Sequence, residues 1–170
     1  MNNINIIFEF LNNLIQVLTP YKTGEFDRIL ESKGGNVNAA TSKDYTHYYI
    51  KIDSKHFDEA MKLHSDMLLN IAIPQNELDM ERKVVIEEIS RSEDNPQSRV
   101  FENLIKTLLK DTPYERRVLG TSDIISTISR DEIFNFYYDW YRPENMVTVV
   151  VGNVNPEHVI QEVEKDFNKT

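Results

Sequence analysis

The strongest constraint on the fold is a long amphipathic stretch at residues 76–92, which reads NELDMERKVVIEEISRS. Pro74 precedes it, and acidic residues occupy what would be the first turn, where a helix N-terminus favours negative charge. Leu78, Val85 and Ile89 recur at spacings of seven and four residues, which predicts one apolar stripe. The stretch therefore predicts a single helix that packs against a core along one side.

Two glutamates in this stretch, Glu81 and Glu88, are seven residues apart, so both fall on nearly one face of the predicted helix. A carboxylate beside an apolar stripe requires a partner, such as a cation, a hydrogen-bond donor or a metal ion. The simpler interpretation is a solvated face on which Arg82, Lys83 and Arg91 are the neighbouring cations. From this helix alone, that interpretation is favoured over a functional one.

The composition excludes several kinds of site. The chain of 170 residues is long enough for one domain with a core, and its net charge of −9 argues against nucleic acid and anionic membrane surfaces as partners. There is no cysteine, which excludes disulfides, thiol catalysis and Cys-ligated metals. A zinc site built from this chain must use carboxylates or the four histidines, His47, His56, His64 and His158.

Residues 1–18 contain apolar runs but no early Lys or Arg, and Glu9 interrupts them. They match neither a secretory signal nor a membrane span. We therefore expect a cytoplasmic protein, or a chain that has lost its original start. His64 lies on the apolar face of a predicted helix, which is typical of a hydrogen-bonded core histidine.

The pattern predicts an α+β fold with an antiparallel or mixed sheet and helices mainly on one face. Residues 36–52 predict a hairpin whose turn is at 42–44, with a small, polar first strand that could form an exposed edge. The apolar run 146–151 predicts a central strand of the same sheet. Such a sheet is thin, so we expect strands to be missing at the N-terminus and the isolated chain to be marginally stable or self-associating. Predicted helices cover residues 4–18, 23–32, 53–70, 76–92, 97–109, 129–140 and 155–167.

Several segments carry a family resemblance in their order and spacing. They are GGNVNAAT at 34–41 with DYTHYY at 44–49, ERKVVIEEI at 81–89, PY at 113–114 with LGT at 119–121, FY at 136–137, YRPENM at 141–146 and VG at 151–152. Together, over about 140 residues, the pattern resembles the insulinase/pitrilysin family of zinc peptidases, the inverzincins.

The resemblance implies a set of site residues. The family's zinc is held by two histidines from a His-x-x-Glu-His helix and by a glutamate far downstream. By this resemblance Glu88 is the downstream metal ligand and Glu81 its supporting acidic neighbour. Asn38, Ala39 and Thr41, in the first hairpin strand, are the expected substrate-binding residues, because an exposed strand edge can bind a peptide by strand addition.

The chain departs from the family at the motif itself, because no His-x-x-Glu-His occurs in it. Where the motif is expected, residues 9–13 read EFLNN, so Glu9, Asn12 and Asn13 stand at the His, Glu and His positions. Asn is a poor zinc ligand, and its amide cannot act as a general base. We therefore expect residues 1–20 to be a degenerate or replaced motif helix, and residues 21–170 an incomplete domain that neither binds zinc nor hydrolyses peptides.

Three functions remain open from the sequence. The first is a non-catalytic homologue that binds peptides or pairs with a second insulinase-like half or subunit. The second is a part of an active zinc endopeptidase. The third is a purely structural packing domain. Zinc content and peptide turnover separate the first two, and peptide binding without turnover separates the first from the third.

Overall fold

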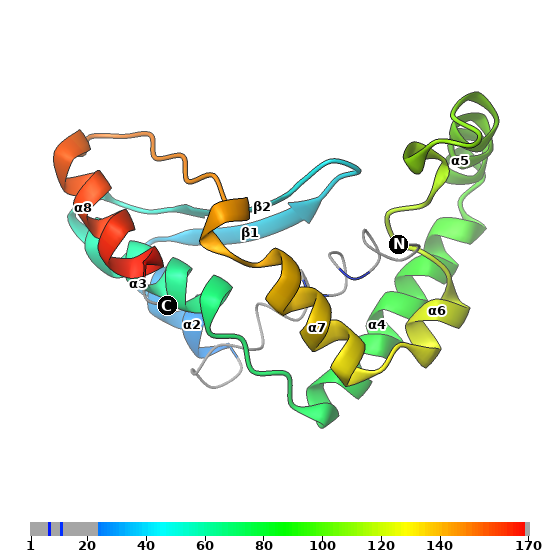
Figure 1. The fold of residues 1–170 in the computed structure, drawn as a ribbon, viewed down its shortest axis with the longest axis horizontal. Helices are drawn as coiled ribbons and strands as arrows, with labels where there is room; N and C mark the ends of the chain where they lie inside the picture. The colour runs from blue at the N-terminus through cyan, green and yellow to red at the C-terminus, as the bar shows by residue number, and fades with distance from the viewer. Residues whose placement is uncertain (1–6, 8–10, 12–23, 169–170) are drawn as a thin grey trace.

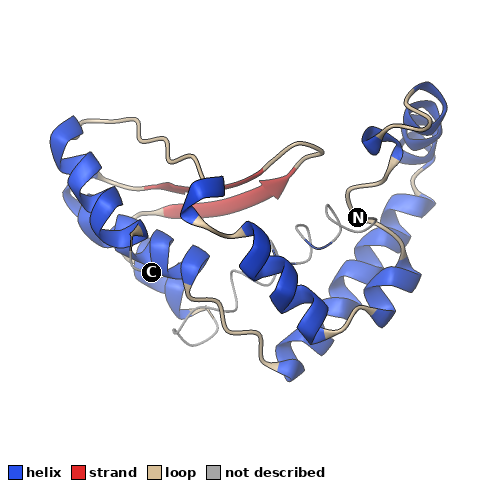
Figure 2. Cartoon of the chain, viewed as in Figure 1, coloured by secondary structure: helices blue, strands red, loops and turns tan. Residues whose placement is uncertain are grey.

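The computed structural model describes residues 7, 11 and 24–168, which form helices around one β-hairpin (Figure 1, Figure 2). No helix within this described part is long and apolar enough to cross a membrane. The elements are α2 (Glu25–Glu31), β1 (Asn36–Thr41), β2 (Thr46–Lys51), η1 (Ser54–His56), α3 (Phe57–Leu69), α4 (Gln75–Asp94), α5 (Pro96–Leu108), η2 (Pro113–Glu115), α6 (Ser122–Thr127), α7 (Arg130–Trp140), η3 (Pro143–Asn145) and α8 (Pro156–Phe167).

The predicted hairpin is confirmed. β1 pairs with β2 in antiparallel register, with Ala39 opposite Tyr48, and the N–H of Ser42 donates to the carbonyl of Tyr45 at 2.8 Å to close the turn. α2 and α3 lie on the same side of the hairpin (Figure 1), as expected for helices that cover one face. Gly35 joins α2 to β1 so closely that a Cβ there would lie 2.8 Å from the carbonyl oxygen of Leu30.

The prediction of a strand at residues 146–151 is wrong. No strand is formed there, and β1 and β2 make up the whole sheet within the described residues. Val147, Val149 and Val151 are 88%, 77% and 92% exposed, so alternate side chains of this run face away from the core. An apolar, β-branched run favours extended backbone, but a strand also needs a hydrogen-bonded neighbour, which the described part of the chain does not place beside it.

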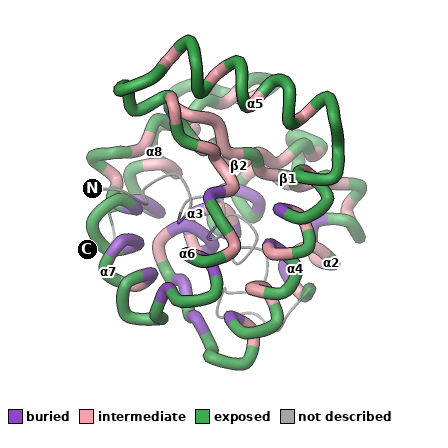
Figure 3. Tube along the Cα trace, turned by 90° about the vertical axis from the view of Figure 1, so that its right-hand side faces the viewer, coloured by how far each residue is buried: buried purple, intermediate pink, exposed green. Residues whose placement is uncertain are grey.

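The core includes buried residues of α3, α4 and α7. The predicted stripe on α4 is confirmed, because Leu78, Val85 and Ile89 are all buried. α7 begins with a capping box, in which the side chain of Ser129 accepts from the N–H of Glu132. α5, by contrast, has no buried residue and is exposed along most of its length (Figure 3).

Two side chains, one partly buried and one buried, connect separate helices by hydrogen bonds. The guanidinium of Arg82 on α4 donates to the carbonyls of Ile125 and Ile128, and so holds the C-terminal end of α6 against α4. The hydroxyl of Tyr137 on α7 donates to the carbonyl of Leu68 at 3.0 Å and accepts from the N–H of Ile71 at 3.4 Å. These bonds satisfy backbone groups where α3 ends and where α6 ends.

Candidate functional site

The two glutamates of α4 remain the centre of the candidate site. Glu81 and Glu88 are both half-buried, and buried Val85 lies between them on the helix. Burial raises the pKa of the Glu81 carboxyl above its ordinary value, and the negative charge of Glu88 raises it further. Arg82, expected as a neighbouring cation, is turned toward α6 instead. Neither carboxylate has an ion-pair partner among the described residues.

This arrangement predicts a pH-dependent effect of Glu81→Gln. A raised pKa means that the folded state favours protonated Glu81, so the ionised carboxylate opposes folding at neutral pH. The variant should melt at a higher temperature than the natural chain at pH 7. The gain should shrink as the pH falls and vanish below the ordinary glutamate pKa of 4.5, where Glu81 is protonated in both the folded and unfolded states. Thermal melts followed by circular dichroism from pH 4 to pH 8 measure it.

The control for this experiment is Glu87→Gln, which removes the same charge from an exposed position of the same helix. It should change the melting temperature at pH 7 much less than Glu81→Gln does, because Glu87 is exposed to water. A larger loss of stability in Glu81→Gln than in Glu87→Gln at pH 7 would mean that a cation holds the Glu81 carboxylate.

The described residues do not fit a zinc centre by themselves. Within residues 24–168 no three His, Asp or Glu side chains come together in a group that could hold a metal ion. Glu81 and Glu88 supply two carboxylates at most, whereas a catalytic zinc takes three protein ligands and a water. The sequence positions expected to complete the site, Glu9, Asn12 and Asn13, lie outside the described residues.

Within the described residues, no histidine joins a group that could hold a metal ion. His47 stacks on Tyr49 in β2, with ring centroids 6.2 Å apart, and the ring of His158 lies 2.6 Å from a carboxylate oxygen of Asp58. The prediction that His64 is a hydrogen-bonded core histidine is wrong for its Nε2. This atom is buried and has no hydrogen-bond partner within the described chain. Burial lowers the pKa of His64 to about 4, so the ring is neutral at pH 7.

The expected substrate-binding residues lie on β1, whose outer edge is not paired with another described strand. Asn38 is exposed, and its side-chain oxygen accepts the backbone N–H of Ala39 at 2.8 Å. Thr41 accepts a hydrogen bond from the hydroxyl of Thr46 across the hairpin at 3.2 Å. A strand added at this edge would therefore replace the Asn38 side chain as the partner of the Ala39 N–H.

One contact near this edge was not predicted. In the hairpin turn, Lys43 donates to the carbonyls of Tyr114, at 2.6 Å, and Arg116. The Tyr114 hydroxyl in turn donates to the carboxylate of Asp44 at 2.5 Å. No periodic pattern in the sequence connects residues about 70 positions apart. The one available signal was that both loops contain complementary hydrogen-bond donors and acceptors. The contact holds the hairpin turn against the loop that contains η2.

Comparison with known proteins gives consistent matches. Residues 9–122 match the family described as Insulinase (Peptidase family M16), and residues 127–169 match the one described as Peptidase M16 inactive domain. The uncharacterized zinc protease YmxG of Bacillus subtilis is 35% identical over 169 residues, which cover 96% of this chain and 40% of that protein. An uncharacterized zinc protease of Rickettsia bellii is 34% identical over 144 residues, 85% of this chain and 34% of that protein.

Solved structures agree with the sequence matches. The crystal structure of a protease from Helicobacter pylori has a TM-score of 0.91 and 31% identity, and the match covers 96% of this chain and 40% of that one. The periplasmic protease PqqL from Escherichia coli, at 24% identity and a TM-score of 0.87, shares the fold. The chain thus spans between a third and two fifths of the length of the curated relatives named above. One family profile matches residues 9–122, which are well over half of this chain. The chain therefore belongs to the insulinase family of peptidases, M16.

Proposed function

We propose that this chain is a non-catalytic, peptide-binding domain of the M16 family. The observation that carries the proposal is the set of potential zinc donors. Glu88 lies on α4 two turns from Glu81, while by the family resemblance Glu9, Asn12 and Asn13 offer one carboxylate and two amides at the positions of the family's histidines and general base. Without that base and those ligands, no residue of the chain can activate water for peptide hydrolysis by the route that the family uses.

The β1 edge supports the peptide-binding part of the proposal. Its residues are small and alternate in exposure, and no other strand in the described structure pairs with its outer edge. The Ala39 N–H is held by a neighbouring side chain rather than by β2, so it can be exchanged for a peptide carbonyl. Such strand addition gives affinity through backbone hydrogen bonds with little demand on side chains.

An alternative is that the chain is one part of an active zinc peptidase. It is favoured by the relatives named as zinc proteases, which are two to three times as long as this chain. In that case further polypeptide would have to supply the missing ligands and the base, with Glu88 completing the site.

The test is binding and turnover of a quenched fluorogenic peptide of about ten residues, long enough to cover one strand. We expect saturable binding without cleavage, both with and without added zinc. Ala39→Pro should weaken binding about tenfold or more, because proline cannot donate the edge hydrogen bond. Ala39→Ser keeps the N–H and is the matched control, which should bind as the natural chain does.

Two outcomes contradict the proposal. Zinc-dependent cleavage by the purified chain would favour the active peptidase. Absence of binding by the natural chain, or equal binding by Ala39→Pro and Ala39→Ser, would remove the β1 edge as a peptide site and favour a structural domain.

A further inference from the structure

The tip of the hairpin is a closely hydrogen-bonded turn that presents two polar side chains. The hydroxyl of Ser42 donates to the carbonyl of Tyr45 at 3.0 Å, and accepts from the N–H groups of Asp44 at 3.3 Å and Tyr45 at 3.2 Å. These bonds add to the backbone bond from Ser42 to Tyr45 and hold the turn in one shape. The side chains of Lys43 and Asp44 therefore start from a fixed position at the end of the hairpin.

Three hydrogen bonds join this turn to the loop that contains η2. The ammonium of Lys43 donates to the carbonyls of Tyr114, at 2.6 Å, and Arg116, and the hydroxyl of Tyr114 donates to the carboxylate of Asp44 at 2.5 Å. Each segment both donates and accepts, and every bond includes a charged group, which makes it stronger than a bond between neutral groups. Lys43, Asp44 and Tyr114 together form a strap between the two segments.

The far side of the strap is fixed to the C-terminal end of α4 by Arg117. Its guanidinium donates to a carboxylate oxygen of Glu93 at 2.8 Å and to the hydroxyl of Ser92 at 3.4 Å, and its Nε lies 3.0 Å from a carboxylate oxygen of Glu102 on α5. Ser92 follows Glu88 by about one helical turn. A continuous series of hydrogen bonds and ion pairs therefore leads from the hairpin turn to the part of α4 that carries Glu88.

The hairpin has two other attachments, at its base and at its middle. At the base, the N–H of Gly35 donates to the carbonyl of Leu30 at 2.8 Å, which ties β1 to α2. At the middle, the hydroxyls of Tyr48 and Tyr141 lie 2.6 Å apart, and Ala39 is opposite Tyr48. At about 3.3 Å per residue, the tip extends roughly 10 Å beyond Ala39. The strap therefore holds the part of the β1 edge that lies beyond the middle attachment.

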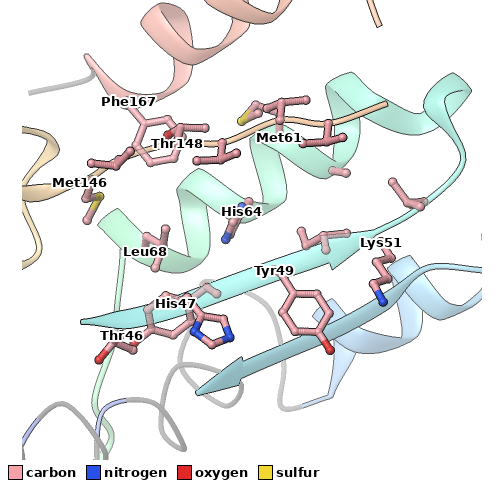
Figure 4. Close-up of a pocket in the computed structure, with 18 of the residues that line it drawn as sticks. Thr46, His47, Tyr49, Lys51, Met61, His64, Leu68, Met146, Thr148 and Phe167 are labelled. Atoms are coloured by element: carbon pink, nitrogen blue, oxygen red, sulfur yellow. The ribbon is translucent and has the colours of Figure 1, made fainter. Parts of the chain in front are cut away.

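One face of β2 carries a row of side chains that stiffens the hairpin. Figure 4 shows His47, Tyr49 and Lys51 following one another along this strand. The ring of His47 lies 5.8 Å from that of Tyr45 and 6.2 Å from that of Tyr49, and the ammonium of Lys51 lies 5.7 Å from the centre of the Tyr49 ring. Contacts that continue along a strand in this way resist bending, so the position of the tip is transmitted along the strand pair.

We propose that the strap positions the β1 edge relative to α4, so that a peptide added at that edge is bound in one preset geometry. The inference rests on the proposed function, and it gives Lys43, Asp44 and Tyr114 a positioning role, because none of them needs to touch the peptide. A site that is already ordered loses less binding free energy to ordering. Without the strap, the edge would hold the binding geometry for only a fraction of the time, and the apparent affinity would fall by that fraction.

The position of the hairpin tip can be measured directly, because the natural chain contains no cysteine. Spin labels on Tyr45→Cys at the tip and on Glu87→Cys on α4, both exposed positions, give their separation by double electron–electron resonance. With the strap intact, we expect one narrow distribution of distances. Tyr114→Phe removes the bond to Asp44, Lys43→Met removes the other two, and each should broaden the distribution.

The same two substitutions, in the chain without labels, should weaken binding of the quenched fluorogenic peptide about fivefold or more. They should lower the melting temperature by about 4 °C or less, because the bonds that they remove are exposed to water. A purely structural role would give the reverse, a loss of stability with little change in affinity. Tyr138→Phe and Lys110→Met make the same chemical changes at exposed positions outside the strap and should change neither affinity nor stability.

Asp44 allows a rescue experiment within the strap. Asp44→Ala removes the acceptor of the Tyr114 hydroxyl, so it should broaden the distance distribution and weaken peptide binding as Tyr114→Phe does. Asp44→Asn keeps a side-chain oxygen that can accept this bond. It should therefore restore the narrow distribution, with an affinity within about twofold of that of the natural chain.

Two results would overturn the strap. One is an unchanged distance distribution in Tyr114→Phe and Lys43→Met. The other is a broadened distribution with unchanged peptide affinity, because the tip would then move without affecting the peptide. Absence of peptide binding by the natural chain would instead overturn the proposed function at the β1 edge, and the positioning role with it. Since the distance measurement needs no peptide, the two failures are distinguishable.

Discussion

The triple variant Glu9→His, Asn12→Glu, Asn13→His should bind zinc several orders of magnitude more tightly than the natural chain. In the helix that the sequence predicts at residues 4–18, the two histidines would stand four residues apart on one face, and Glu88 on α4 would supply the third protein ligand. The free energy of zinc binding by three such ligands is far more favourable than that of binding by scattered carboxylates. Calorimetric titration with zinc, on both chains at pH 7, measures the difference.

Two further variants identify the third ligand. Adding Glu88→Gln to the triple variant should remove most of the gained affinity, because an amide replaces the carboxylate ligand. Adding Glu87→Gln, at the adjacent exposed position, should leave the affinity unchanged. Tight, stoichiometric zinc binding by the natural chain would contradict the loss of the metal site. No gain in the triple variant would contradict the alignment of residues 9–13 with the family motif.

The largest effect on stability is expected from Ile89→Ala. Ile89 is fully buried in the stripe of α4 that faces the core, and truncation leaves a cavity in addition to the lost transfer free energy. The free energy of unfolding should fall by about 2–5 kcal/mol, a large part of the ~5–15 kcal/mol typical of a domain. For a chain of this length the melting temperature should fall by roughly 5–15 °C. Urea titration and thermal melts measure both quantities.

Val84→Ala is the matched control for this prediction. Val84 lies on the same helix but is 48% exposed, so the same kind of truncation should change the free energy of unfolding by about 0.5 kcal/mol or less. Equal effects of the two substitutions would mean that the apolar stripe of α4 is not what holds this helix to the core. Since Glu81 and Glu88 depend on α4 for their position, that outcome would also weaken the candidate site.

The sequence by itself determined the elements whose signals are local. The spacing of Leu78, Val85 and Ile89 predicts the buried face of α4, and the four-residue pattern from Ser129 to Glu132 predicts the start of α7. Alternation in residues 45–52 predicts the hairpin, since one strand side chain in two points to the same face. Family membership also followed from the order of short motifs. In each case the information lies within a few residues along the chain.

Only the tertiary structure decided which of these segments meet. An apolar pattern predicts extended backbone at residues 146–151, but whether that backbone becomes a strand depends on a neighbour that the pattern does not contain. The same holds for the contact between Lys43 and the loop at Tyr114, and for the Nε2 of His64, which has no partner among the described residues. Hydrogen bonds between segments distant in sequence depend on how the helices and the hairpin pack, and packing is a property of the whole chain.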